Sequence, residues 1–430
     1  MTRYSLYIGK ESTSMSITTH SEISQQALEG IVVLDLAGPA GNYCGKLFAD
    51  MGADVILIEP LSGAPTRHML PTADGQTGME AGLVFQYQNT NKRSVVLDLE
   101  APGTQAVIRE LAKNAHVIIE SEAPGVMERR GLGYSTLRQS NPQLVMTSIT
   151  SFGQKGPYAD WLGSDLVGMA TGGMLYLAGY PDTAPTVAFG EQAIGAANLF
   201  AAVATMAAVY EAECSNSGQH IDVSVQESVV MGMENAVQFY DLEGTIRKRN
   251  AGEQRIAGMG VFPCKDGYIY LMAGGVGGNR FWADTVRWLT EEGLERAAEL
   301  TETCWNERDY LSSSEAKKRF YDIFSTFAME HTKVQLQEKG RRQRIPIAPI
   351  LNTSELDKSA QRKHRSYFVD VTSSYGEQIG MPGAPYKLTR TPWAVHKGAP
   401  RFGQHTFDVL RALNVSESRI QSLREEGSLR

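Results

Sequence analysis

Short apolar runs alternate with helical patterns over the first half of the chain. Each run is brief and nearly continuous, which is typical of strands that are buried on both faces of a sheet. The alternation of strand and helix predicts a parallel sheet covered by helices. A long helix of small residues follows over 194–212. The expected strands lie near residues 31–36, 54–59, 94–98, 116–120 and 144–149.

The pattern changes beyond about residue 226. Charged helical stretches occupy 282–300 and 314–340, and short apolar runs near 268–273 and 367–371 predict strands. This region predicts a second, smaller α+β domain. A chain of 430 residues also exceeds the usual size of a single core, so two domains are expected.

Composition narrows the function classes. The formal net charge of −7 argues against nucleic acid as the main partner, because phosphate backbones require a cationic face. The four cysteines lie far apart without metal-ligand spacing, which predicts free thiols and no metal site. Residues 1–26 are polar and lack the apolar core of a secretory signal, and the Ala-rich stretch 193–209 predicts a buried helix rather than a membrane span. We therefore expect a soluble, cytoplasmic protein without membrane partners.

Residues 31–60 form the most informative segment. They read as a βαβ unit with glycines in its first turn, and the helix behind that turn presents free N–H groups suited to phosphate. A dinucleotide-binding unit would require G-x-G-x-x-G, with Glu59 on a ribose, but Gly38, Gly41 and Gly45 depart from that spacing. A P-loop fails as well, since Leu47 stands where Ser or Thr is needed.

The same segment resembles a different family. Residues 40–56, A-G-N-Y-C-G-K-L-F-A-D-M-G-A-D-V-I, are similar to the opening of the class III coenzyme A transferases, which include formyl-CoA transferase, carnitine CoA-transferase and the 2-methylacyl-CoA racemases. Asn42 stands where the family usually has Pro. Further matches follow in the family's order from residue 28 to 430: N-K-R-S at 91–94, L-D-L at 97–99, P-G-V-M-E-R at 124–129, G-Q-K-G-P at 153–157, S-G-Q at 217–219, I-P-I-A-P-I at 345–350 and P-R-F-G-Q-H-T at 400–406.

The resemblance implies an architecture and a set of partners. The fold class is α/β: a Rossmann-like large domain with a parallel sheet, plus a smaller α+β domain, in an interlocked homodimer. Coenzyme A and acyl-CoA are implied as substrates alongside a small carboxylic acid, with no permanently bound cofactor. The domains implied are a flexible extension at 1–26, a large CoA-binding domain at 27–225, a linker and small domain at 226–380, and a return to the large domain at 381–430.

CoA transfer between acids requires a carboxylate nucleophile in a site that excludes water and offers N–H donors to the oxyanion. Transferases of this family place an Asp after a Gly and before a helix, and Glu191 occupies that place here, one methylene longer. Three roles are open for Glu191: the nucleophile, a base that does not attack, and an acid that only stabilises the helix N-terminus.

Asp165 is the second candidate acid. In the family's racemases the matching motif is Gly-His-Asp, but Ser164 replaces the histidine here, and no histidine lies between His116 and His220. Racemisation needs a second base, so a supporting role for Asp165 is favoured. The alternatives to a transferase are a racemase or isomerase of the same family, a nucleotide-binding oxidoreductase, and a catalytically silent CoA-binding protein.

The resemblance also implies residues that hold CoA. Arginine suits phosphate because its planar fork makes two parallel hydrogen bonds. Pro60 and Glu100 replace residues that are often basic in the family. Gly258 and Gly260 lie where formyl-CoA transferase has a mobile glycine loop over the active site, and glycine leaves such a loop free to close. The remaining expected contacts are Ala40, Gly41, Asn91, Lys92, Arg93 and Arg129.

Overall fold

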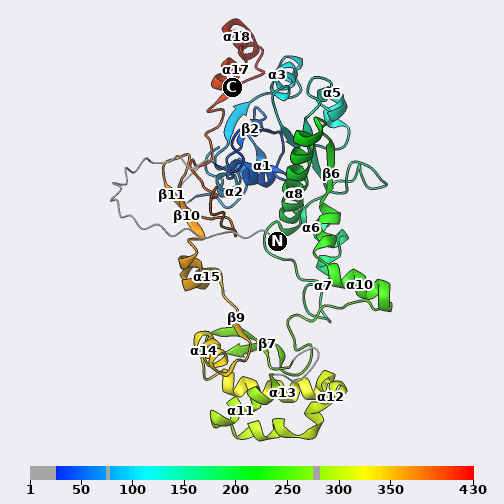
Figure 1. Ribbon diagram of the computed structural model, residues 1–430, viewed down its shortest axis with the longest axis vertical. Helices are drawn as coiled ribbons and strands as arrows, with labels where there is room; N and C mark the ends of the chain where they lie inside the picture. The colour runs from blue at the N-terminus through cyan, green and yellow to red at the C-terminus, as the bar shows by residue number, and fades with distance from the viewer. Residues whose placement is uncertain (1–25, 74–77, 275–280) are drawn as a thin grey trace, which may run out of the picture.

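The computed structural model describes residues 26–73, 78–274 and 281–430. The predicted extension 1–26 lies outside these ranges except for its last residue. Figure 1 shows two lobes: a large one that contains most of the described residues up to 225 and also the C-terminus, and a small one that is joined to it by two long connections.

The large lobe is built on a parallel sheet of six strands in the order β3-β2-β1-β4-β5-β6. The five strands expected from the apolar runs are present. The sixth, β6, was missed because polar residues alternate with Ile221 and Val223 in it, as suits an edge strand whose first half is exposed. The strands are β1 Val32–Asp35, β2 Asp54–Glu59, β3 Arg93–Val96, β4 Val117–Glu120, β5 Val145–Thr150 and β6 His220–Ser224.

Helices cover both faces of this sheet, as the alternating pattern predicts. One buried cluster contains Leu34, Ile58 and Ile108, and a second on the opposite side contains Val33, Phe48 and Ala201. Successive residues of β1 therefore contribute to different clusters, because strand side chains alternate between faces. The helices of this lobe are α1 Asn42–Ala49, η1 Pro65–His68, α2 Leu83–Gln88, α3 Pro102–Ala112, α4 Val126–Arg129, α5 Tyr134–Leu137, α6 Asp165–Thr171, α7 Met174–Leu177, α8 Gln192–Ser215, α9 Val225–Met231 and α10 Glu234–Glu243.

Helix α8 is the long small-residue helix expected at 194–212. In the described part of the chain it is the one helix that is long and apolar enough to cross a membrane, a property that core helices share. Ala197, Ala201 and Ala208 are buried against the large lobe, whereas Val203 and Tyr210 on the other side are each 70% exposed. The small residues let one face approach the sheet closely, and the opposite face carries large apolar side chains with no cover from this chain.

The small lobe is a three-stranded antiparallel sheet packed against helices, with strand order β7-β8-β9. Both predicted helices here are broken. Gly293, with a positive φ of 80°, follows the end of α11, and Thr332 begins α14 with a reciprocal capping box to Gln335. The elements are β7 Met259–Cys264, β8 Gly267–Met272, α11 Trp282–Glu291, η2 Glu295–Thr301, η3 Thr303–Asn306, α12 Arg308–Ser312, α13 Ser314–Ala328, α14 Lys333–Gln343 and β9 Ile347–Pro349.

The chain then runs back to the large lobe (Figure 1). Ser374 is already bonded to that lobe, since its hydroxyl accepts from Gln86 Nε2 at 2.6 Å, ahead of the expected return at residue 381. Further on, the Thr406 hydroxyl accepts from the Val96 backbone N–H at 3.1 Å. The domain boundaries themselves stay predictions. The last elements are α15 Thr353–Lys358, α16 Ala360–His364, β10 Phe368–Thr372, β11 Gln378–Pro382, α17 Thr406–Ala412 and α18 Glu417–Glu425.

Candidate active site

Two helix N-termini bring the two candidate acids together. Asp165 is the first residue of α6, which Ser164 caps by accepting from the Val167 N–H at 3.4 Å. Glu191 occupies the N-cap position of α8. The Asp165 carboxylate accepts a hydrogen bond from the backbone N–H of Ile194 at 2.9 Å, so α6 and α8 are joined at the point where both acids lie.

The two carboxylates influence each other. Partial burial raises the pKa of Glu191 above its ordinary value, and the negative charge of Asp165 raises it further. Glu191 is only partly buried, so its carboxylate remains reachable from solvent. The residue before it, Gly190, has a positive φ of 81°, which favours glycine and turns the chain into the helix. The arrangement therefore presents a half-buried carboxylate at a helix N-terminus.

Asn198 connects this acid pair to the glycine turn after β1. Its Oδ1 accepts from the Cys44 N–H at 2.7 Å, and its Nδ2 donates to the Ala40 carbonyl at 2.8 Å. Asn198 is fully buried, so these bonds fix α8 against α1. Ala40 is thereby held close to the first turns of the helix that carries Glu191.

A cavity of about 470 Å³ lies at the carboxyl ends of β1, β4 and β5. Strand order reverses between β1 and β4, and crevices at such a reversal are the usual ligand sites of open parallel sheets. The Ser121 hydroxyl spans this reversal by accepting from the Gly38 N–H at 2.9 Å. Ala40, Arg129, Ser164 and Ile194 all line the cavity, so it reaches from an expected CoA contact to the acid pair.

The glycine turn itself is packed rather than open. A Cβ atom on Gly41 would lie 2.5 Å from Ala37 Cβ, and one on Gly45 would lie 2.3 Å from Asp35 Oδ2. Beneath the turn, the Lys92 ammonium donates to Asp35 Oδ2 and to the Asn42 carbonyl, both at 2.7 Å. Both charged side chains are fully buried, so Lys92 has its hydrogen-bond partners within the protein and does not face the cavity.

The two neighbours of Lys92 are also engaged in protein contacts. Asn91 has a positive φ of 62°, and its side chain accepts from the backbone N–H groups of His396 and Lys397, which holds the returning C-terminal segment. Arg93 pairs with Asp54 on the adjacent strand, with Nε 2.8 Å from Oδ1. Of the residues expected at the nucleotide, the structure brings Ala40 and Arg129 to the cavity and places Asn91, Lys92 and Arg93 elsewhere.

Glu59, the residue that would hold a ribose in an oxidoreductase, is fully buried. Its two oxygens accept from Arg67 Nε at 2.6 Å and Arg67 Nη2 at 2.8 Å. The Ser94 hydroxyl donates to the same carboxylate at 2.5 Å. The Glu59 carboxylate at the end of the βαβ unit is thus part of the core, where a bound ribose could not reach it.

Gly258 and Gly260 lie in the small lobe, apart from the acids of the same chain (Figure 1). Gly258 has a positive φ of 80° and donates its N–H to Gln254 Oε1 at 2.7 Å. Gly260 is paired within β7 and β8, where a Cβ would lie 2.8 Å from the Gln254 Cα. Both glycines are thus required by packing within the small lobe, and their role as a lid stays a prediction.

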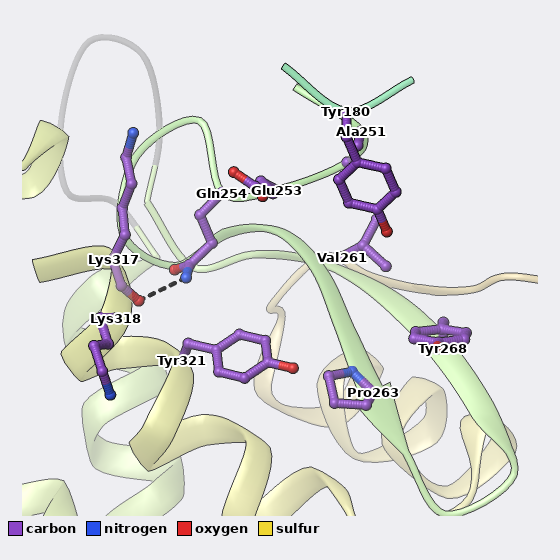
Figure 2. A pocket seen from close by; sticks show the side chains of 11 residues that line it. Tyr180, Ala251, Glu253, Gln254, Val261, Pro263, Tyr268, Lys317, Lys318 and Tyr321 are labelled. Carbon is purple, nitrogen blue, oxygen red and sulfur yellow. Dashed lines mark hydrogen bonds between the residues drawn. The ribbon is translucent and has the colours of Figure 1, made fainter. Parts of the chain in front are cut away.

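A second cavity of about 550 Å³ lies near these glycines and is lined by small-lobe residues together with Tyr180 from the segment after α7 (Figure 2). Figure 2 shows the rings of Tyr180, Tyr268 and Tyr321 around it, with Gln254 bonded to the Lys317 carbonyl at 2.7 Å. Neither cavity is lined by a candidate acid, but the cavity in the large lobe is lined by Ser164, which precedes Asp165, and by Ile194, which bonds to it. The smaller cavity is therefore the candidate active site, because its lining residue Ile194 bonds to Asp165, whose charge in turn acts on Glu191.

Two residues of this site are not among those predicted from the sequence. Asn198 sits inside an Ala-rich helix, and a single buried amide in such a helix is the signal that could have singled it out. Trp161 lines the cavity from the loop before Asp165, where an aromatic residue in a Gly-rich loop was a visible signal. Within the residues that the structure describes, no group of three or more His, Cys, Asp or Glu side chains could hold a metal ion.

Comparison with known proteins identifies the class. The model of CoA-transferase family III matches residues 28–406, so the chain belongs to that family. Succinyl-CoA:(R)-benzylsuccinate CoA-transferase subunit BbsE of Thauera aromatica is 36% identical over 92% of this chain and 97% of the relative. Succinate–glutarate CoA-transferase of Agrobacterium fabrum is 31% identical over 91% and 96%.

The fold agrees with solved structures. A CAIB/BAIF family protein from Brucella suis has a TM-score of 0.79, with 24% identity over 90% of this chain and all of that protein. The predicted α/β class and the resemblance to CoA transferases are thus confirmed. The protein is a CoA-transferase that acts on acyl-CoA and carboxylic acids, which sets aside the oxidoreductase and silent-protein alternatives.

Proposed function

We propose that the protein moves coenzyme A from succinyl-CoA to a second carboxylic acid, with Glu191 as the nucleophile. The Thauera and Agrobacterium relatives, whose names give succinyl-CoA and succinate, support this donor. The observation that carries the assignment of Glu191 is its position: a half-buried carboxylate at the N-terminus of α8, beside Asp165 and the cavity.

The reaction proceeds in balanced steps. The Glu191 carboxylate attacks the thioester carbonyl, and the CoA thiolate leaves as a mixed anhydride forms. The thiolate then attacks the glutamyl carbonyl, which releases succinate and leaves a glutamyl-CoA thioester. The acceptor carboxylate attacks this thioester and displaces the thiolate, which finally attacks the acceptor carbonyl and restores the free Glu191 carboxylate.

The helix N-terminus supplies electrostatic support for these steps. Among the described residues, no acceptor contacts the backbone N–H groups of Gln192 and Ala193, while the N–H of Ile194 is taken by Asp165. Free N–H groups at a helix N-terminus stabilise developing negative charge on an oxyanion. Asp165 positions the start of α8 through its bond to Ile194.

Coenzyme A is a substrate in this scheme, and we propose no permanently bound cofactor. Its anionic nucleotide end lies toward Arg129 and the turn at Ala40, and its thioester lies toward Glu191. Arg129 is the cationic side chain among the residues that line the cavity, and its planar fork can make two hydrogen bonds to a phosphate. Cytoplasmic location is part of the same proposal, since acyl-CoA substrates are found there.

The test uses two substitutions at one position. Glu191→Gln should abolish CoA exchange while CoA still binds, because an amide cannot form the anhydride. Glu191→Asp restores the acid with a shorter reach and should retain activity reduced by up to about 10²-fold. Borohydride added after succinyl-CoA should reduce Glu191 alone, which peptide mass spectrometry detects. If Glu191→Gln retained full transfer activity while Asp165→Asn were inactive, the nucleophile would be Asp165 instead of Glu191.

The structure gives no support to the racemase alternative. A racemase needs a second base near Asp165, but His220 lies on the edge strand β6 with its Nε2 2.8 Å from the Ser148 hydroxyl. Exchange of the α-hydrogen of a 2-methylacyl-CoA in deuterated water would reveal racemisation. We expect no such exchange above background.

We further propose that a second subunit completes the enzyme as an interlocked homodimer. The uncovered apolar side chains of α8 and α10 support this, with Tyr210 70% exposed, Tyr240 63% and Leu242 80%. Tagged and untagged proteins that are each folded before mixing should not exchange subunits within minutes, because threaded chains must unfold to separate. The Thauera relative is named as a subunit, so a chain that stays monomeric alone would point to a different partner subunit.

A further inference from the structure

The loop between β5 and α6 holds a cluster of three aromatic rings, of which Trp161 lines the cavity. The rings of Tyr158 and Trp161 lie 4.2 Å apart between centroids. Phe152 meets both of them edge-on, at 5.9 Å from Tyr158 and 6.2 Å from Trp161. Edge-to-face and offset contacts of this kind are favourable, so the rings support one another's orientation.

This loop is anchored at several points. The backbone N–H of Gln154 donates to both Asp222 oxygens at 3.0 Å, which ties the start of the loop to β6. Near its end, Gly163 lies so close to Ser151 that a Cβ would approach the Ser151 hydroxyl oxygen to 2.1 Å. The rings are therefore presented by a loop closed upon itself, which reduces the entropy lost when a ligand binds.

The aromatic surface is open. Trp161 is 58% exposed and Tyr158 43% exposed, and Leu162 beside them is 95% exposed. Trp161 and Leu162 both line the cavity, together with Ser164 and Ile194, which adjoin the acid pair. Arg129, the cation suited to phosphate, comes from a different element, the end of α4. The aromatic wall thus belongs to the loop that leads into Asp165.

We propose that Trp161 recognises an aryl group on the carboxylic acid that accepts CoA, so that the favoured acceptors are aryl-substituted carboxylic acids. This inference rests on the proposed CoA transfer at Glu191. The indole face offers a flat apolar surface at the acyl end of the cavity, and an aryl group stacked on it would cover the ring and exclude water from the thioester.

The experiment compares two acceptors that differ only in the ring, 2-benzylsuccinate and 2-methylsuccinate, with succinyl-CoA as donor. In the native enzyme kcat/KM should favour the benzyl compound. Trp161→Leu should lower that preference ratio about 10-fold, and Trp161→Phe should keep most of it because a ring remains. Tyr268→Leu is the matched control: Tyr268 is 56% exposed but lies in the small lobe, so the ratio should not change.

Three results would overturn the proposal. An unchanged ratio in Trp161→Leu would show that the indole does not contact the acceptor. A raised KM for succinyl-CoA with both acceptors equally affected would assign the ring to the adenine of the donor. Loss of subunit assembly in Trp161→Leu, seen by mass photometry, would make the aromatic wall a subunit contact.

A binding measurement separates this inference from the proposed function. Calorimetric titration of Glu191→Gln with benzylsuccinyl-CoA and methylsuccinyl-CoA needs no turnover. The benzyl compound should bind more tightly, and the difference should vanish when Trp161→Leu is added. If the native enzyme transfers CoA to neither acid yet this difference is present, the proposed reaction fails while the aryl site stands; equal binding of both thioesters contradicts the aryl site itself.

Discussion

The glycine turn after β1 and the paired N-termini of α6 and α8 both unite glycines with charged residues, yet they differ in solvent access. Under the turn, Asp35 and Lys92 are fully buried and hydrogen-bonded within the protein. At the helix N-termini, Asp165 and Glu191 are only partly buried, and Glu191 has a raised pKa. Charges satisfied by protein partners stabilise the fold, whereas a half-exposed acid beside a cavity remains available for chemistry.

The buried pair should show the largest effect on stability. Lys92→Met leaves the Asp35 carboxylate buried without its cation, and breaking a buried pair in this way costs about 3–5 kcal/mol. Burial already raises the pKa of Asp35, so the variant should fold with this carboxyl protonated and should gain stability as pH falls. Urea unfolding followed by circular dichroism measures the loss.

The neighbouring residue provides the control. The Arg93–Asp54 pair is partly exposed, with side-chain exposures of 34% and 46%, so Arg93→Met should cost at most about 1 kcal/mol. Native stability of Lys92→Met combined with weakened CoA binding would contradict the comparison. That result would instead support the CoA-binding role of Lys92 that the family resemblance implies.

The open acid pair should show a smaller effect, visible in the pH dependence of activity. Glu191 attacks as the carboxylate, so kcat/KM should fall as the pH drops through its raised pKa. Burial is the main cause of that raised pKa and the charge of Asp165 the second. Asp165→Asn removes only the second cause, so the acid limb should move to lower pH, while the burial of Glu191 keeps it above the ordinary value for glutamate.

A pH–rate profile of both proteins with saturating acceptor tests this expectation. Asp165→Gln is the companion variant, since it also removes the charge but cannot reproduce the bond from the Ile194 N–H with the same reach. If the acid limb of the pH–rate profile keeps its position in both Asp165→Asn and Asp165→Gln, the two acids do not interact. A limb that moves to higher pH would contradict the sign of the interaction.

Local patterns in the sequence determined much of the fold. The apolar runs located five strands of the parallel sheet, because a strand buried on both faces must be apolar at nearly every position. The edge strand β6 was missed because its first residues are exposed and polar. The stretches 282–300 and 314–340 were each predicted as one helix, but the structure divides both. The breaks depend on the capping of Thr332 and on the left-handed conformation of Gly293, which periodicity does not show.

The candidate site was predicted less completely. Glu191 and Asp165 could be named from their motifs, and Ala40 and Arg129 from the family resemblance. No local pattern predicts that Asp165 bonds to Ile194 and so lies close enough to Glu191 to raise its pKa. The N-K-R-S segment shows the reverse case. Its charges suggested phosphate, whereas the structure turns Asn91 toward the C-terminal return and Lys92 into the core.

The sequence by itself therefore determined the class of fold and the family, and it named the two candidate acids, since these depend on the kinds of residues present and on their order. Only the tertiary structure decided which charges are buried, which face the cavity and which aromatic rings lie beside the acids. The physical reason is that the direction and solvent access of a side chain are set by neighbours distant in the chain. Lys92 and Arg93 are adjacent in sequence, yet Lys92, just before β3, is buried against Asp35, whereas Arg93, the first residue of β3, pairs with Asp54 at the surface.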